Sequence, residues 1–207
     1  MSCLSYTSRW KAVKGKEGDA SGQGKESCKK GEAAKVMRYF PLIPRLKRLY
    51  MSTKTSQDMR WHKEDVDRLE LKDDVLRHPA DGLAWKEFDK KYPDFAADSR
   101  SVRLGLASDG FNPYRLLNTT HSTWPVVLIP YNLPPRLCMK PTSFILSTII
   151  PGKLGPGLNI DVYLQPLIHE LKMLWDGVDA FDVHSGKNFK MRAALHSTIN
   201  DFPAYAM

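Results

Sequence analysis

The stretch that decides the fold covers residues 102–110 and reads VRLGLASDG. In its first seven residues, Val102, Leu104 and Leu106 alternate with other side chains, which is the period of a β-strand with one buried face. The Asp109-Gly110 pair that follows is expected to end this strand. The pattern therefore places an aspartate directly after a strand.

Further elements follow in the C-terminal half of the chain. Residues 124–129 and 143–150 are two more strand candidates, separated by a proline-rich turn. Over residues 162–175, apolar side chains recur on one helical face, which predicts an amphipathic helix with Pro166 in its first turn. Residues 193–199 are a fourth strand candidate, weaker in composition. The predicted order is three strands, a helix and a fourth strand.

Two aspartates, Asp109 and Asp201, follow the first and the fourth of these strands. If the first three strands form an antiparallel meander, a right-handed helical crossover makes the fourth strand parallel to its partner. If that partner is the first strand, the two carboxylates lie at the same end of neighbouring strands, about 5 Å apart. Such carboxylates repel each other unless a cation lies between them, and their oxygens favour Mg²⁺ or Mn²⁺. The pattern leaves open that both aspartates only cap turns.

The basic charge of the chain is concentrated near its N-terminus. Residues 1–60 hold 14 Lys and Arg against 5 Asp and Glu, whereas the rest of the chain holds 17 against 18. Residues 11–35 are rich in Lys, Gly, Ser and Glu, which predicts disorder because so little apolar surface can be buried. A basic segment on a near-neutral domain suits nucleic-acid binding. A solvated lead-in without a partner is the alternative.

Residues 36–50 combine basic and apolar side chains. Pro44 can open a short helix in which Leu46, Leu49 and Tyr50 share one face. The basic side chains of this stretch are Arg38, Arg45, Lys47 and Arg48. They are candidates for contacts with the DNA backbone. The alternative is that the helix docks on the body of the protein.

Composition excludes several classes of protein. A chain of 207 residues that is 42% hydrophobic can build a folded core. Its longest apolar runs are far shorter than the roughly 20 residues of a membrane helix, so no membrane partner is expected. The glycines form no phosphate-binding pattern, and no Ser or Cys lies in a nucleophile motif, so we expect no small-molecule substrate.

Several longer blocks of sequence carry a family resemblance. In the C-terminal half they are residues 103–113 (RLGLASDGFNP), 124–135 (WPVVLIPYNLPP), 151–168 (PG, a loop and DVYLQPLI) and 198–205 (TINDFPAY). Upstream they are residues 38–52 (RYFPLIPRLKRLYMS), 59–62 (MRWH) and 77–89 (RHPADGLAWKEFD). In this order the blocks resemble plant CACTA-type (En/Spm-like) DNA transposases, over residues 36–206.

The resemblance implies an RNase H-like core with the acidic metal ligands of a DDE transposase, acting on DNA in the nucleus. The family's first acidic residue corresponds to Asp109 and its second to Asp201, with Asp161 as a rival for the second position. These residues would hold Mg²⁺ or Mn²⁺. The third acidic ligand lies further downstream in the family than Met207. We therefore expect a truncated, catalytically incomplete transposase that binds metal weakly.

Together these observations predict a mixed α+β or α/β fold in three regions. These are a disordered basic lead-in (1–35), a basic and aromatic helical linker region (36–98) and a truncated RNase H-like transposase core (99–207). The expected partners are DNA, at transposon ends, and a full-length transposase. Two alternatives stay open: a non-catalytic protein that binds DNA or a transposase, and a decayed transposon relic without function.

Overall fold

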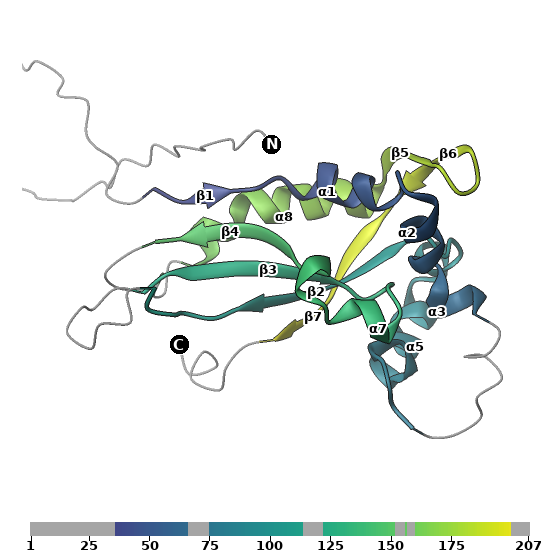
Figure 1. The fold of residues 1–207 in the computed structure, drawn as a ribbon, viewed down its shortest axis with the longest axis horizontal. Coiled ribbons are helices and arrows are strands. Elements are labelled where there is room, and N and C mark those ends of the chain that lie inside the picture. Colours follow the sequence, from purple (N-terminus) through teal and green to yellow (C-terminus); the bar gives the residue numbers. More distant parts are fainter. Residues whose placement is uncertain (1–35, 66–74, 114–121, 152–155, 157–159, 200–207) are drawn as a thin grey trace, which may run out of the picture.

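The computed structural model of the chain describes residues 36–65, 75–113, 122–151, 156 and 160–199. These residues form an α+β fold in which helices pack on a five-stranded sheet (Figure 1), as the sequence predicts. The lead-in 1–35, predicted to be disordered, and Asp201 lie outside the described residues.

The helices are α1 (Leu42–Leu49), α2 (Thr53–Asp58), α3 (Trp61–Glu64), α5 (Leu83–Lys91), α6 (Pro93–Ala96), α7 (Pro135–Cys138) and α8 (Ile160–Asp176), with short 3-10 turns η1 (Pro79–Asp81) and η2 (Pro141–Ser143). The strands are β1 (Arg38–Tyr39), β2 (Val102–Ser108), β3 (Trp124–Pro130), β4 (Ile145–Ile150), β5 (Val178–Asp182), β6 (Lys187–Met191) and β7 (Ala193–Ile199). None of the helices in the described part of the chain is long and apolar enough to cross a membrane.

The strand order of the main sheet is β1-β4-β3-β2-β7. Strands β2, β3 and β4 form an antiparallel meander, and β7 pairs in parallel with β2. The chain passes from β4 to β7 through α8, which contacts both of these strands and so lies across one face of the sheet. The predicted meander and the parallel return of the fourth strand beside the first are both confirmed.

Pro166 lies inside α8, so its predicted place in the first turn is wrong. A proline at this position has no N–H to donate to the preceding turn. The helix continues past the proline because Leu167 and Leu174, which lie seven positions apart on the same face, are both buried in the core. The Pro166 carbonyl also accepts a hydrogen bond from the Tyr39 hydroxyl, at 3.3 Å.

The N-terminal stretch is an integral part of this fold. Residues 38–39 form β1, an edge strand that the sequence did not predict, paired antiparallel with β4. The following helix α1 buries Leu42 and Leu46 completely, and Tyr50 at its end is also fully buried. The alternative of a helix docked on the body of the protein is therefore confirmed for α1.

A single acidic side chain anchors this stretch to α8. The Glu170 carboxylate accepts hydrogen bonds from the Tyr39 hydroxyl and from the Leu42 backbone N–H, the latter at 2.5 Å. The second bond satisfies one of the free N–H groups at the start of α1, where a negative charge is also favourable. Burial, followed by the bond to Glu170, raises the pKa of Tyr39 well above its usual range. Glu170 thus joins β1, α1 and α8.

The hairpin of β5 and β6 is a second element that the sequence did not predict. It lies between α8 and β7 and forms a separate two-stranded sheet, turning at Gly186 with φ +66°. Its inward positions hold Ala180, Asp182 and Phe189, all buried. Gly186 and the alternation of apolar residues on both sides of it are typical of a hairpin. Asp182 interrupts this alternation at a position where an apolar residue is expected.

One hydrophobic core connects all of these elements. It contains Leu42 and Trp85 from the helical region together with Leu104, Leu128 and Leu167 from the sheet and α8. Trp85 of α5 is only 4% exposed and packs in this core. The helices of residues 36–98 therefore share their core with the sheet.

Candidate functional site

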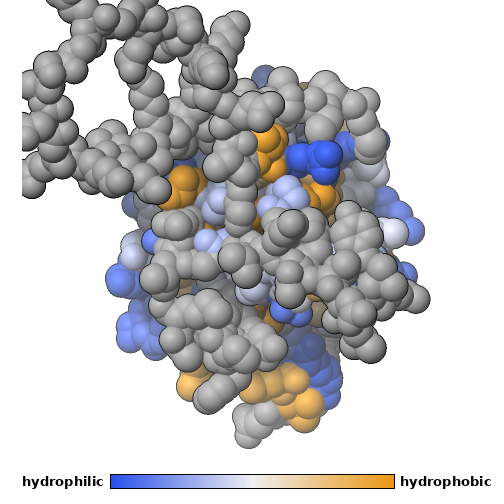
Figure 2. Space-filling model, turned by 90° about the vertical axis from the view of Figure 1, so that its left-hand side faces the viewer, coloured by the Kyte–Doolittle hydropathy of each residue, from blue (hydrophilic) through white to orange (hydrophobic). Residues whose placement is uncertain are grey.

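The candidate site lies where β2 and β7 end side by side. These strands are parallel, and their last described pair is Ala107 opposite Ile199. In the sequence, Asp109 follows Ala107 by two positions, and Asp201 follows Ile199 by two positions. Figure 2 views the molecule from this end, where hydrophilic and hydrophobic side chains alternate between the grey residues.

The backbone around Asp109 is held in place by β3. Strand β2 pairs with β3 up to Ser108 opposite Val126, and an isolated bridge joins Phe111 to Thr123 in the same register, with N–O distances of 3.0 and 2.9 Å. Asp109 lies between these two pairs. The regular strand ends at Ser108 as predicted, but the chain stays paired beyond the Asp-Gly step.

Gly110 lets an indole pack directly beside Asp109. A Cβ atom at Gly110 would lie 2.5 Å from Cε2 of Trp124, closer than real Cβ contacts. Any larger residue would displace the Trp124 ring or the backbone that carries Asp109. The Asp109 side chain itself is exposed and has no hydrogen-bond or ion-pair partner among the described residues. It is free to bind a ligand from solvent.

The structure does not bring the other predicted acids into a described cluster with Asp109. Asp161, the rival second acid, is exposed in the first turn of α8. Within the described ranges, no three His, Cys, Asp or Glu side chains lie close enough together to hold a metal ion. The pair of Asp109 and Asp201 stays a prediction, because Asp201 is outside the described residues.

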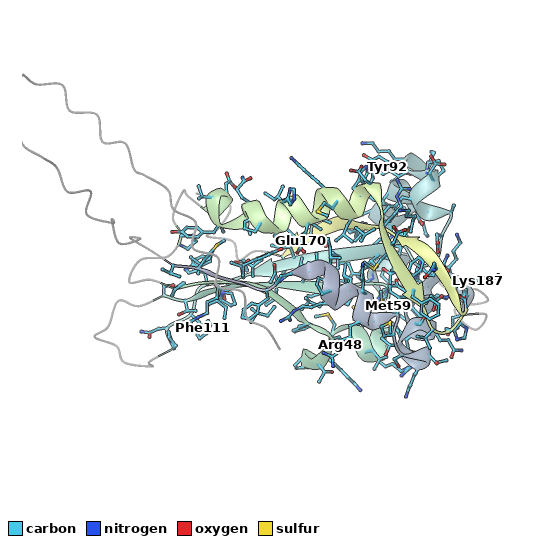
Figure 3. The ribbon with its side chains drawn as sticks, turned by 90° about the horizontal axis from the view of Figure 1, so that it is seen from above. Arg48, Met59, Tyr92, Phe111, Glu170 and Lys187 are labelled. Atoms are coloured by element: carbon cyan, nitrogen blue, oxygen red, sulfur yellow. The ribbon has the colours of Figure 1, made fainter. Side chains whose placement is uncertain are left out.

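The predicted DNA-contacting side chains lie on β1 and on the outer side of α1. Arg38 and Arg48 are exposed, and Figure 3 shows Arg48 on the side of α1 away from Glu170 and α8. Arg45 and Lys47 are half-buried, and the Arg45 guanidinium lies 5.3 Å from the centre of the Phe40 ring. These cations are carried by a strand and a helix that are both fixed to the core.

A model of the family described as "Transposase family tnp2" matches residues 73–207, which is more than half of the chain. The chain belongs to this family. No curated protein and no solved structure shows significant similarity to it. The tnp2 assignment gives the chain a transposase-related function and makes DNA its expected ligand.

This tnp2-family chain also buries a carboxylate that the sequence did not single out. Asp182 of β5 is fully buried and accepts hydrogen bonds from Ser56 at 2.5 Å, from Ser185 at 2.7 Å and from Arg60. The Arg100 guanidinium lies 3.6 Å away. Burial alone would raise the pKa of Asp182, but the hydrogen bonds from the two serines and the charge of Arg60 lower it to about 2. The hairpin is thereby joined to α2.

Arg103 is the second buried charge of the tnp2 chain, and it lies in β2 itself. Its side chain is 1% exposed, and its guanidinium lies 4.3 Å from the centre of the Trp85 ring and 5.3 Å from that of Phe95. An ion pair with Asp89 provides the counter-charge. Burial lowers the pKa of Arg103, against the opposing effect of Asp89. The strand that carries Asp109 is thus fixed to α5 by a cation among aromatic rings.

Proposed function

We propose that this chain supplies part of an RNase H-like transposase core, in which Asp109 and Asp201 hold Mg²⁺ or Mn²⁺ for DNA strand cleavage and transfer. The observation that carries the proposal is the parallel pairing of β2 with β7, because it directs both strands toward the same edge of the sheet. The order of three antiparallel strands, a helix and a parallel fourth strand supports it further.

The residues present suit a hard divalent cation. Carboxylate oxygens are the ligands that Mg²⁺ and Mn²⁺ prefer. The Asp109 carboxylate is exposed, and no residue that the structure describes competes for it. A bound metal would activate the attacking oxygen and stabilise the leaving oxygen of a phosphodiester. Asp109 would bind this metal, and the contact between Gly110 and Trp124 would keep its backbone in position. Asp161 stays the rival for the second ligand.

Metal titration of the whole chain tests these assignments. We expect Asp109→Asn and Asp201→Asn each to weaken Mn²⁺ binding by about tenfold or more, because each removes a charged oxygen ligand. Isothermal titration calorimetry measures this affinity. Asp161→Asn should bind like the wild type, and so should Asp94→Asn, which removes an exposed aspartate of α6. If Asp161→Asn weakens Mn²⁺ binding and Asp201→Asn does not, Asp161 is the second ligand. If Asp109→Asn binds Mn²⁺ as tightly as the wild type, the proposed site is wrong.

We also propose that Arg38, Arg45, Lys47 and Arg48 contact the backbone of DNA at transposon ends, in the nucleus. The exposure of Arg38 on β1 and of Arg48 on α1 supports this, because both elements are fixed to the core and leave these cations accessible to a phosphate. A full-length transposase is the proposed protein partner. The alternative is a protein that binds DNA without catalysis. It predicts salt-dependent DNA binding that survives Asp109→Asn combined with Asp201→Asn.

The salt dependence of DNA binding tests the basic side chains. We expect Arg48→Gln to weaken binding to unrelated DNA sequences alike and to lower the slope of log affinity against log salt by about 1, because one phosphate contact is lost. Fluorescence anisotropy with a labelled duplex gives both values. Lys140→Gln is the matched control, since it removes one exposed positive charge elsewhere on the chain. Equal slopes for the two variants would count against the assignment.

A further inference from the structure

A polar hollow lies between the N-terminal helices, the loop before β2 and the β5–β6 hairpin. Its volume is about 550 Å³. The polar side chains that line it are Arg60, Asp98, Ser99, Arg100, Ser185 and Lys187. Figure 3 shows Lys187 at the opposite end of the molecule from Phe111, so the hollow is separate from the candidate metal site.

Two arginines of the hollow are held rigidly. Arg60 pairs with the buried Asp182. Arg100 donates to both oxygens of Asp98, from Nε at 2.8 Å and from Nη2 at 2.7 Å, and its guanidinium lies 4.1 Å from the centre of the Phe189 ring. A cation that is already ordered loses little conformational entropy when it binds a ligand.

The hollow still has positive charge and free donors. Three cations line it, against one carboxylate in the lining, that of Asp98. Behind the lining, Asp182 and Glu64 both pair with Arg60, so Lys187 is the cation whose charge is left over. Lys187 is exposed and makes no ion pair with any residue that the structure describes. An anion in the hollow would give its ammonium group acceptor oxygens.

We propose that this hollow binds a phosphate group, as free phosphate or as a phosphodiester of nucleic acid. Guanidinium groups match the oxygens of phosphate, and an ammonium group adds a mobile charge to them. The hydroxyl groups of Ser99 and Ser185 border the same space, but they already donate to Glu64 at 2.8 Å and to Asp182 at 2.7 Å, so the cations carry the proposed binding. The proposed metal ligands Asp109 and Asp201 do not line the hollow, so the phosphate proposal does not depend on the metal site.

Thermal unfolding of the full chain in phosphate tests the site. Inorganic phosphate is compared with chloride at equal ionic strength, because a ligand that binds only the folded chain raises Tm. We expect phosphate to raise Tm of the wild type and Lys187→Gln to weaken the apparent phosphate affinity about fivefold, as the loss of one partly exposed charge contact would do. Lys187→Glu should abolish the effect.

The matched control lies on the same hairpin. Lys190 is exposed, pairs with Asp179 at 2.8 Å and does not line the hollow. Lys190→Gln should therefore respond to phosphate like the wild type. The proposal is overturned if phosphate does not raise Tm of the wild type above chloride, or if Lys187→Gln and Lys190→Gln respond equally.

A labelled DNA duplex distinguishes the two sources of phosphate. If nucleic acid occupies the hollow, inorganic phosphate will compete with DNA on the wild type, and Lys187→Gln will bind DNA less tightly than Lys190→Gln. If both variants bind DNA equally while only Lys187→Gln loses the phosphate response, the hollow takes free phosphate. Unchanged Mn²⁺ binding by Lys187→Gln in the same preparation separates this result from a failure of the metal site.

Discussion

Asp182→Ala is expected to lower the free energy of unfolding by about 3–5 kcal/mol, the usual cost of removing one partner from a buried charge pair. Asp182 is fully buried, and the change leaves the Arg60 and Arg100 guanidiniums without the carboxylate between them. The buried Ser56 hydroxyl loses its acceptor as well. Urea unfolding followed by circular dichroism measures the effect.

Asp179→Ala is the control on the same strand. Its carboxylate is exposed and pairs with Lys190 in solvent, so no measurable change in the free energy of unfolding is expected. Equal stabilities of the two variants would show that the buried network adds nothing.

Acid titration of the same variants gives a second measurement. The folded pKa of about 2 lies below the ordinary aspartate value, so Asp182 stabilises the fold at pH values above about 4. This contribution, about 2 kcal/mol, is lost as the pH falls toward 2. Asp182→Ala should lack this part of the pH dependence.

Arg103→Ala is expected to lower the free energy of unfolding by about 3 kcal/mol. The change empties the space among the Trp85, Phe88 and Phe95 rings and removes the counter-charge of Asp89. Arg103→Lys should not restore the loss, because a lysine lacks the planar group that stacks on Trp85. Urea unfolding followed by tryptophan fluorescence reports on this site.

Arg136→Ala is the matched control for Arg103. Arg136 also pairs with an aspartate, Asp58, at 2.8 Å, but its side chain is 62% exposed. We expect this variant to lose no more than about 1 kcal/mol. If Arg103→Ala and Arg136→Ala lose the same amount, the aromatic surroundings of Arg103 do not contribute to stability.

The central part of the fold could be predicted because its elements follow simple periods. The apolar residues of β2 alternate with period two in the sequence, and α8 repeats its apolar residues on one face. The prediction of one buried face for β2 is wrong, because Arg103 on the other face is buried as well. The handedness of helical crossovers then limits where β7 can pair. The same alternation predicts Asp109 directly after β2. The place expected for Asp201 depends instead on the pairing of β7 with β2.

The parts that could not be predicted depend on contacts between distant segments. Strand β1 has only two residues, and its partner β4 lies more than 100 positions away. Ser56 and Asp182, which bond directly, are 126 positions apart. Asp182 also lies at an inward position of β5, where the alternation rule expects an apolar residue. No local pattern contains the information that two distant segments, one with Ser56 and Arg60 and one with Arg100, would surround this carboxylate.

The anchoring of the N-terminal stretch by Glu170 bears on where this protein can be shortened for laboratory production. The family match begins at residue 73, yet the structural unit starts upstream, with β1 along the edge of β4 and α1 on α8. A version cut at residue 73 would leave Glu170 without its donors from Tyr39 and Leu42 and would open a strand edge to aggregation. Expression of residues 73–207 alone would thus yield an incomplete domain.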